Sequence, residues 1–259
     1  MARSYRFITC KIDKEELLSM ETGGNSVISE KEEPDIFYQL SRVLRARPGD
    51  GVILQANSDS PPVFQYLFRI RELKKNGIPV EFISKEINGN ELGFQLNLWV
   101  CLPNKPDKLE MIIQKAVELG ASKIFLFESD FSQFKHNLRM ERLEKIAWEA
   151  AEQAERAIVP EVTEKGKLGN FINGAADNEI KNVLVAMERA DTKPLNLTLS
   201  DFSGSKEISI LVGPEGGFSE NEKILIKEKG LTTFSLGKRI LRMETAVIMA
   251  LGLAGLIKK

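Results

Sequence analysis

Strand-like and helix-like segments alternate along the chain from residue 94 onward. Apolar runs of strand length lie at residues 94–102, 123–127, 182–187, 207–212 and 232–236. Segments with the apolar spacing of a helix lie at residues 107–119, 139–156, 220–229 and 244–257. Such alternation is typical of a mostly parallel sheet whose two faces are covered by helices. We therefore expect an α/β domain in this part of the chain.

The chain before residue 89 has a different pattern, in which short strands are separated by tight turns. Strand-like segments lie at residues 4–10, 51–55, 63–71 and 79–84, and helical spacing lies at residues 34–44. Asn76 followed by Gly77 is a hairpin signal, because both residues tolerate positive φ. Several short strands with even turn spacing predict a small β-barrel. We expect two domains, residues 1–88 and residues 89–259.

Composition excludes several classes of protein. The chain has 259 residues, of which 42% are apolar and 28% charged, and this is typical of a soluble protein that forms its core without disulfides or metals. The longest apolar run, residues 246–257, is shorter than a membrane-spanning helix requires. The N-terminal segment lacks the pattern of a signal peptide. We therefore expect a cytoplasmic protein without a membrane span.

Charge and metal-ligating residues give little indication of function by themselves. The net charge of -1 comes from 36 basic and 37 acidic residues, so a nucleic-acid partner would have to contact a local basic patch. His136 is the only histidine, and Cys10 and Cys101 stand in apolar strand-like segments. A zinc site would lack ligands, so we expect no metal. We interpret the cysteines as buried thiols, and His136 as a surface or RNA-facing residue rather than a general base.

The strand at residues 207–212 leads directly into a glycine-rich segment, residues 213–219, with the sequence GPEGGFS. Ser219 and Glu222 form the sequence pattern of a capping box, which begins a helix. In open α/β sheets ligands bind beyond the carboxyl ends of the strands, and glycines let the main chain approach them closely. Neither G-x-G-x-x-G nor G-K-[ST] is present, which disfavours an ATP-using enzyme. A glycine turn that serves packing alone is the other interpretation.

Two further loops are expected at the same edge of the sheet. The strand at residues 232–236 ends at Gly237 and is followed by residues 238–245, KRILRMET, which lead into the last helix. Main-chain groups of the two glycine loops could bind a purine nucleoside without contacting a phosphate. The loop after residues 182–187 includes Met187 and Glu188, and the Glu188 carboxylate would suit ribose hydroxyls. The pattern predicts a nucleoside pocket.

The segments LVGPEGGFS at residues 211–219 and LGKRILRMETA at residues 236–246 together resemble the paired signature of the RsmE family. Members of that family are bacterial methyltransferases of the SPOUT class, which methylate N3 of a uridine in 16S ribosomal RNA of the small subunit. Further matches cover almost the whole chain in the same order, and they lie at residues 42–45 (RVLR), 113–120 (IQKAVELG), 145–147 (KIA), 149–153 (EAAEQ) and 160–162 (PEV).

The resemblance implies a fold, a cofactor and an assembly. The fold is an N-terminal PUA-like RNA-binding β-barrel followed by an α/β domain with a trefoil knot, and the assembly is a homodimer. The cofactor is S-adenosylmethionine, held in the knot through main-chain groups. Matching positions that should line its pocket are Gly213, Glu215, Gly216, Leu236, Gly237, Ile240 and Leu241, with Met187 and Glu188 from the third loop.

The reaction implied by the resemblance requires removal of a proton. Uracil N3 carries a proton at neutral pH, so the site needs a base or a group that stabilises the uracil anion. Arg242 is expected to stabilise the anion, and Glu244 to accept the proton or to hold Arg242 in place. The other interpretation is a structural pair at a helix start, where the helix dipole favours Glu244.

Local basic residues are expected to contact the RNA, and they are Arg42, Arg45, Lys135, Arg139 and Arg156. Two positions depart from the family pattern. Ser129 stands where the family usually has arginine, and Glu155 where it usually has glycine. These departures lower the positive charge where an anionic substrate is expected, so another RNA target is an alternative. A ribose 2′-O-methyltransferase and a non-catalytic RNA-binding assembly factor are further alternatives.

Overall fold

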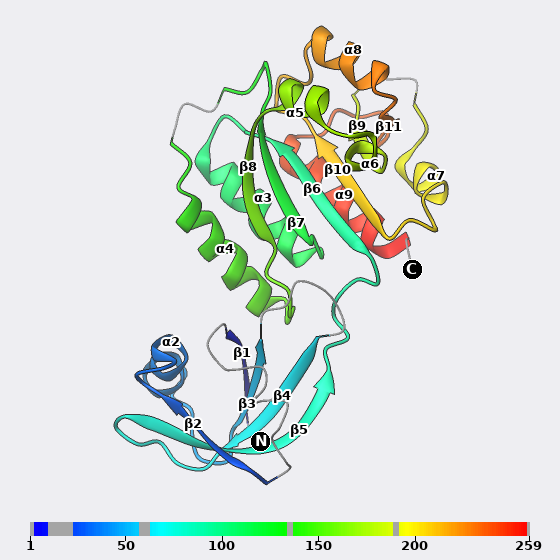
Figure 1. The fold of residues 1–259 in the computed structure, drawn as a ribbon. Coiled ribbons are helices and arrows are strands. Elements are labelled where there is room, and N and C mark those ends of the chain that lie inside the picture. Colours follow the sequence, from blue (N-terminus) through cyan, green and yellow to red (C-terminus); the bar gives the residue numbers. More distant parts are fainter. Residues whose placement is uncertain (1–2, 10–22, 57–62, 134–136, 189–191, 258–259) are drawn as a thin grey trace. The chain divides into compact units, whose positions relative to one another are not determined.

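The computed structural model describes residues 3–9, 23–56, 63–133, 137–188 and 192–257 (Figure 1). These residues form two compact units. The first extends to Glu91 and also includes Glu155–Ile158, and the second comprises Leu92–Ala154 and the chain from Val159 onward. The boundary expected after residue 88 lies close to Glu91. The return of residues 155–158 to the first unit was not expected from the sequence.

The first unit is built on a five-stranded sheet in the order β1-β3-β4-β5-β2. Its strands are β1 (Ser4–Thr9), β2 (Asn25–Ser29), β3 (Gly51–Ala56), β4 (Phe64–Ile70) and β5 (Gly77–Ile87). The pairing of β1 with β3 is parallel and the other pairings are antiparallel. The expected alternation in β4 is confirmed, because Tyr66, Phe68 and Ile70 are buried in the core. Helix α2 (Pro34–Tyr38) and the π-helix η1 (Gln39–Val43) contribute Phe37 and Leu40 to that core.

The hairpin between β4 and β5 is present, but its turn differs from the expected one. Lys75 and Asn76 form the turn, and Lys74 pairs with Gly77 across it. Gly77 is the first residue of β5, and a Cβ atom there would lie 2.8 Å from Cγ1 of Val27 on the neighbouring strand. Gly77 is therefore explained by the close approach of β2, and not by a positive φ in the turn.

The second unit is built on a parallel six-stranded sheet in the order β11-β9-β10-β6-β7-β8, as the alternation predicted. Its strands are β6 (Gln95–Cys101), β7 (Lys123–Glu128), β8 (Glu161–Lys167), β9 (Val183–Ala186), β10 (Glu207–Val212) and β11 (Thr232–Phe234). The edge strand β8 was missed in the sequence. So were three short helices, α5 (Leu168–Gly174), α6 (Asp177–Ile180) and α7 (Leu195–Ser200).

Helices cover both faces of this sheet (Figure 1). Helices α3 (Pro106–Glu118) and α9 (Met243–Ile257) lie on one face, and α4 (Met140–Gln153) packs against α3. Helices α5, α6 and α8 (Glu220–Glu228) lie on the other face, over a core that includes Trp99 and Phe127. No helix among the described residues is both long enough and apolar enough to cross a membrane. Since both faces are covered, the carboxyl edge of the sheet is the place where loops can form a site.

Candidate functional site

The carboxyl ends of β9, β10 and β11 meet at one edge of the second sheet. Strand β9 lies between the other two, with Val185 opposite Leu211 of β10 and Ala186 opposite Phe234 of β11. The two glycine loops therefore do not follow adjacent strands. They flank the loop that begins with Met187 and Glu188, which is the arrangement needed for three loops to surround one ligand.

The loop after β11 is fixed by main-chain hydrogen bonds at its beginning, while the main chain further along it forms none among the described residues. Ser235 donates its main-chain N–H to the carbonyl of Lys193 at 3.0 Å and accepts from the N–H of Leu195 at 3.1 Å. Gly237 has a φ of +104°, a conformation that favours glycine. No main-chain hydrogen bond joins residues 238–241 to another residue in the described part of the chain. The Ile240 side chain is 54% exposed, so this stretch offers polar main-chain groups beside an apolar surface.

Different structural constraints explain the three glycines of the loop after β10. A Cβ atom on Gly213 would lie 3.0 Å from the Phe218 ring, and one on Gly216 would lie 3.1 Å from Cβ of Phe131. Packing alone therefore explains Gly213 and Gly216. Gly217 has a φ of +72° and donates its N–H to the carbonyl of Pro214 at 2.9 Å, which closes a turn. A Cβ atom on Gly217 would meet nothing within 4 Å, so that side of the loop is open.

The carboxylate of Glu215 joins the glycine loop to the start of α3. Oε1 accepts a hydrogen bond from Nζ of Lys108 at 2.6 Å, and both oxygens lie 3.2 Å from the N–H of Asn104. Burial raises the pKa of Glu215, but the hydrogen bonds from Lys108 and from the main chain outweigh it and hold the pKa below its usual value. The carboxylate therefore positions the loop. Sequence reasoning missed Lys108 and Asn104, because their partner is distant in the chain.

The expected capping box at Ser219 and Glu222 is confirmed. Glu222 donates its N–H to the Ser219 hydroxyl at 3.2 Å, and Ser219 donates its N–H to the Glu222 carboxylate at 2.9 Å. The same carboxylate, on a residue only 5% exposed, accepts from the hydroxyl of Ser129 at 3.0 Å and the N–H of Asp130 at 3.2 Å. The start of α8 and the loop after β7 are thereby fixed to each other.

Arg242 and Glu244 lie where the loop after β11 enters α9. Arg242 is exposed, and no ion pair links it to Glu244 among the described residues. The Oε2 atom of Glu244 is buried and has no hydrogen-bond partner in the described part of the chain. A buried carboxylate oxygen without a hydrogen-bond donor costs free energy. The expected contact in which Glu244 holds Arg242 is not present.

Comparison with known proteins identifies the family. Residues 90–255 match the RNA methyltransferase domain family. The ribosomal RNA small subunit methyltransferase E of Rickettsia conorii is 31% identical over 228 residues, which cover 88% of each chain. This chain belongs to the RsmE family.

Further RsmE proteins extend the comparison to the cofactor. The Bacillus subtilis enzyme is 30% identical and aligns with 83% of this chain and 84% of its own. The Neisseria gonorrhoeae enzyme has a crystal structure bound to S-adenosylmethionine. It superposes with a TM-score of 0.75 at 26% identity and covers 96% of this chain and 95% of its own. Likeness to RsmE proteins therefore extends over both units.

The expected RNA-binding residues of this RsmE protein lie in different surroundings. Arg42 and Arg45 are exposed in the first unit, and Arg45 has a φ of +51°. Arg139 is exposed just before α4, while Lys135 lies outside the described residues. The expectation that Arg156 contacts RNA is corrected by the structure. Its side chain is 3% exposed and its guanidinium lies 2.8 Å from the Glu91 carboxylate, so the group is occupied within the first unit and does not face RNA.

The two departures from the RsmE pattern have structural explanations. Ser129 is 4% exposed and donates to Glu222, so its side chain belongs to the capping network and not to the surface. Glu155 directly follows the C-cap of α4, Ala154, and has a φ of +56°. Glycine is the residue that adopts this conformation most readily at the end of a helix, which explains the usual family residue.

Proposed function

We propose that this chain transfers a methyl group from S-adenosylmethionine to N3 of a uridine in 16S ribosomal RNA. Membership of the RsmE family supports the reaction, and the cofactor in the Neisseria gonorrhoeae relative supports the methyl donor. The observation in this molecule that supports it most is the stretch 238–241. Its unpaired main-chain groups lie beside the exposed Ile240, as binding of a purine ring requires.

The loops at the carboxyl edge would hold the cofactor. When bound, S-adenosylmethionine supplies an electrophilic methyl group on its sulfonium. The main chain of Leu236, Gly237 and Leu241 would hydrogen-bond the adenine, and Ile240 would cover its face. Gly213 and Gly216 would form the opposite wall, which Glu215 fixes through Lys108. On the middle loop, Met187 would contribute apolar contact, and the exposed Glu188 would accept hydrogen bonds from ribose hydroxyls.

Arg242 and Glu244 would assist removal of the proton from uracil N3. During transfer the N3–H bond and the S–CH3 bond of the methyl donor break and an N3–CH3 bond forms. S-adenosylhomocysteine is the leaving group, and the proton must pass to a carboxylate or to water. The exposed Arg242 guanidinium would lie against a uracil carbonyl oxygen and stabilise the anion. The unpartnered oxygen of Glu244 is the proton acceptor within the described residues that we favour.

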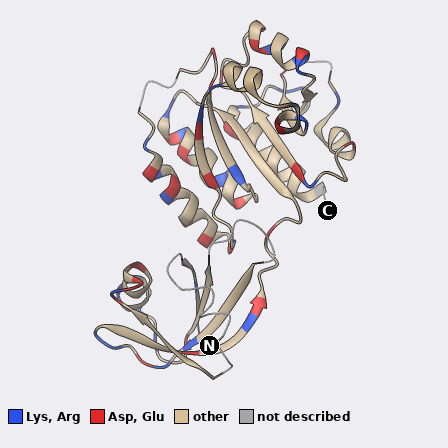
Figure 2. Cartoon of the chain, in the orientation of Figure 1, with Lys and Arg blue, Asp and Glu red and all other residues tan. Residues whose placement is uncertain are grey.

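RNA contacts would come from exposed arginines in both units. Arg42 and Arg45 carry the contact in the first unit, and Arg139, with Lys135 beside it in the sequence, carries it in the second. Helix α4 itself carries four acidic and two basic residues, so the helix would bind phosphates poorly (Figure 2). Because the proposed contacts join arginines to phosphates, RNA affinity should fall as the salt concentration rises.

A homodimer in the cytoplasm completes the proposal. Ile248 and Met249 form an exposed apolar face on α9, at 38% and 40%, and Leu256 near its end is 73% exposed. An apolar stripe of this kind on a helix is suited to a second copy of the chain. Light scattering should give twice the monomer mass, and Ile248→Glu should give the monomer mass. Because the proposed substrate is ribosomal RNA, we propose that the protein acts in the cytoplasm.

Methyl transfer to small ribosomal subunits from a strain that lacks the modification tests the function. Nuclease digestion followed by mass spectrometry should identify 3-methyluridine in the 16S RNA. A 2′-O-methylated nucleotide would instead support the ribose methyltransferase. RNA binding with neither methyl transfer nor cofactor binding would support the assembly factor.

A further inference from the structure

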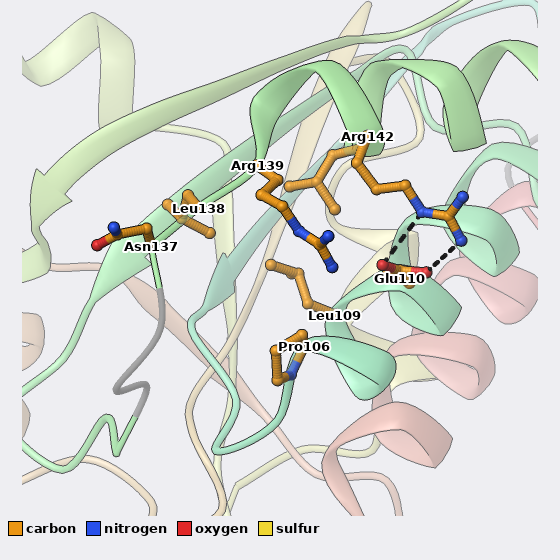
Figure 3. Close-up of a pocket in the computed structure, with 8 residues that line it drawn as sticks. Pro106, Leu109, Glu110, Asn137, Leu138, Arg139 and Arg142 are labelled. Carbon is orange, nitrogen blue, oxygen red and sulfur yellow. Dashed lines mark hydrogen bonds and ion pairs between the residues drawn. The ribbon is translucent and has the colours of Figure 1, made fainter.

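A hollow of about 380 Å³ lies between the beginnings of α3 and α4 in the second unit (Figure 3). Its floor is apolar, because Leu109 and Leu143 line it and are 1% and 4% exposed. The remaining lining residues are Pro106, Glu110, Asn137, Leu138, Arg139 and Arg142. The hollow thus combines a hydrophobic floor with a rim of hydrogen-bonding groups.

The two arginines on the rim differ in their pairing. Arg142 forms a bidentate pair with Glu110, with Nε 3.3 Å from Oε1 and Nη2 2.9 Å from Oε2. The hydrogen bonds from Arg142, partly opposed by burial, lower the pKa of Glu110. The carboxylate therefore stays ionised, and the positive charge of Arg142 balances its negative charge. No hydrogen bond or ion pair joins the Arg139 guanidinium to another described residue, although its positive charge also helps to lower the pKa of Glu110. The guanidinium extends over Leu109 (Figure 3). The rim therefore carries one unpaired positive charge.

The hollow lies at the same edge of the sheet as the candidate cofactor loops. Helix α3 follows β6 and α4 follows β7, so both helices begin beyond the carboxyl ends of parallel strands. Lys108, the residue before Leu109, holds Glu215 of the glycine loop at 2.6 Å. A ligand in the hollow would therefore lie beside the loop proposed to hold the methyl donor.

We infer that this hollow binds an unpaired base of the RNA substrate, next to the nucleotide that is methylated. The inference rests on the proposed function and deepens it. An apolar floor matches the face of a base, and the Arg139 guanidinium can stack on that base or bind its phosphate. Stacking of this kind is typical of proteins that bind single-stranded RNA.

Three variants of the full-length protein test the inference, with a fluorescently labelled single-stranded oligouridine RNA as the probe. Arg139→Ala removes the unpaired charge, and Leu138→Trp fills the hollow without changing the charge. Lys145→Ala is the matched control, because it removes one positive charge from the same helix outside the hollow. Arg139→Ala and Leu138→Trp should each raise the Kd for RNA about tenfold, as expected for the loss of one stacked base. Lys145→Ala should change it less than twofold.

Melting temperature and affinity for S-adenosylhomocysteine should be unchanged in all three variants, which separates the inference from misfolding. A loss with Arg139→Ala but none with Leu138→Trp would show a phosphate contact alone and overturn base binding. Equal behaviour of all three variants, or failure of the unmodified protein to bind the probe, would also overturn it. If the variants change RNA affinity as expected but the unmodified protein does not methylate small subunits, the proposed function fails. Binding of an unpaired RNA base in the hollow then stands, but its place next to a methylated nucleotide does not.

Discussion

Lys108 Nζ lies 2.6 Å from Oε1 of Glu215, and this pair joins the first turn of α3 to the glycine-rich loop after β10. Both side chains are 29% exposed, so water screens the attraction only in part. A loop rich in glycine has many accessible conformations when unrestrained. The pair therefore restrains the loop that we propose to line the cofactor site.

Removing the lysine should weaken cofactor binding without unfolding the protein. We expect Lys108→Ala to raise the Kd for S-adenosylhomocysteine about fivefold, since a partly exposed pair contributes about 1 kcal/mol. Calorimetry measures this, with Lys115→Ala as the control, because Lys115 pairs with Glu118 on the same helix. Lys108→Ala and Glu215→Gln should be less than additive when combined. Unchanged affinity in Lys108→Ala would contradict the positioning role.

The lowered pKa of Glu215 gives stability a defined pH dependence. Burial raises this pKa, but the bonds from Lys108 and the main chain lower it more, so the folded value lies below the usual 4.5. The ionised carboxylate therefore contributes stability that is fully present above the unfolded pKa and is lost as pH falls through the folded pKa. In acid titrations of melting temperature, the unmodified protein should lose its advantage over Glu215→Gln below about pH 4.5. A difference that is constant through this range would contradict the assignment.

Arg242 should act on the chemical step and not on cofactor binding. We expect Arg242→Ala to lower the single-turnover rate of methyl transfer about a hundredfold or more, because it removes the group that stabilises the uracil anion. Affinity for S-adenosylhomocysteine should stay within twofold. Lys227→Ala, which removes an exposed positive charge from α8 outside the proposed site, is the control. Transfer at the normal rate by Arg242→Ala would exclude the role.

Glu155 should be replaceable by glycine with a gain in stability. Its φ of +56° costs a non-glycine residue about 1 kcal/mol, while its ion pair with Arg6 at 3.2 Å is exposed on the glutamate side and contributes little. Glu155→Gly should therefore raise the free energy of unfolding in urea by roughly 0.5–1 kcal/mol. Glu155→Ala keeps the strain and loses the pair, so it should not be stabilising. A gain with alanine equal to that with glycine would show that backbone strain is not the cause.

Features that depend on neighbouring residues in the chain could be predicted from the sequence. The parallel sheet was predicted because its strands and helices have distinct apolar spacings. The capping box was predicted because Ser219 and Glu222 are three residues apart. Strand β8 was missed because its sequence, EVTEKGK, is mostly charged and only Val162 is buried. An edge strand with one buried side chain has too little apolar pattern to detect.

Features that depend on residues distant in the chain could not be predicted. Arg156 was expected to contact RNA, but residues 155–158 return to the first unit. There the Glu91 carboxylate binds the Arg156 guanidinium and the N–H groups of Ala157 and Ile158. Lys108 gave no sign of its role, because Glu215 reaches it only through the order of the strands. A single sequence shows the local spacing of apolar residues, but it does not show which residues distant in the chain form ion pairs.

The crystal structure of the protein soaked with S-adenosylhomocysteine tests the central claim most directly. The account predicts the adenine bonded to main-chain atoms of residues 236–241, Ile240 against the ring, and the loop at residues 213–217 on the other side. Binding of S-adenosylhomocysteine elsewhere on the protein would contradict the account. So would the absence of the ligand from these loops at a saturating ligand concentration.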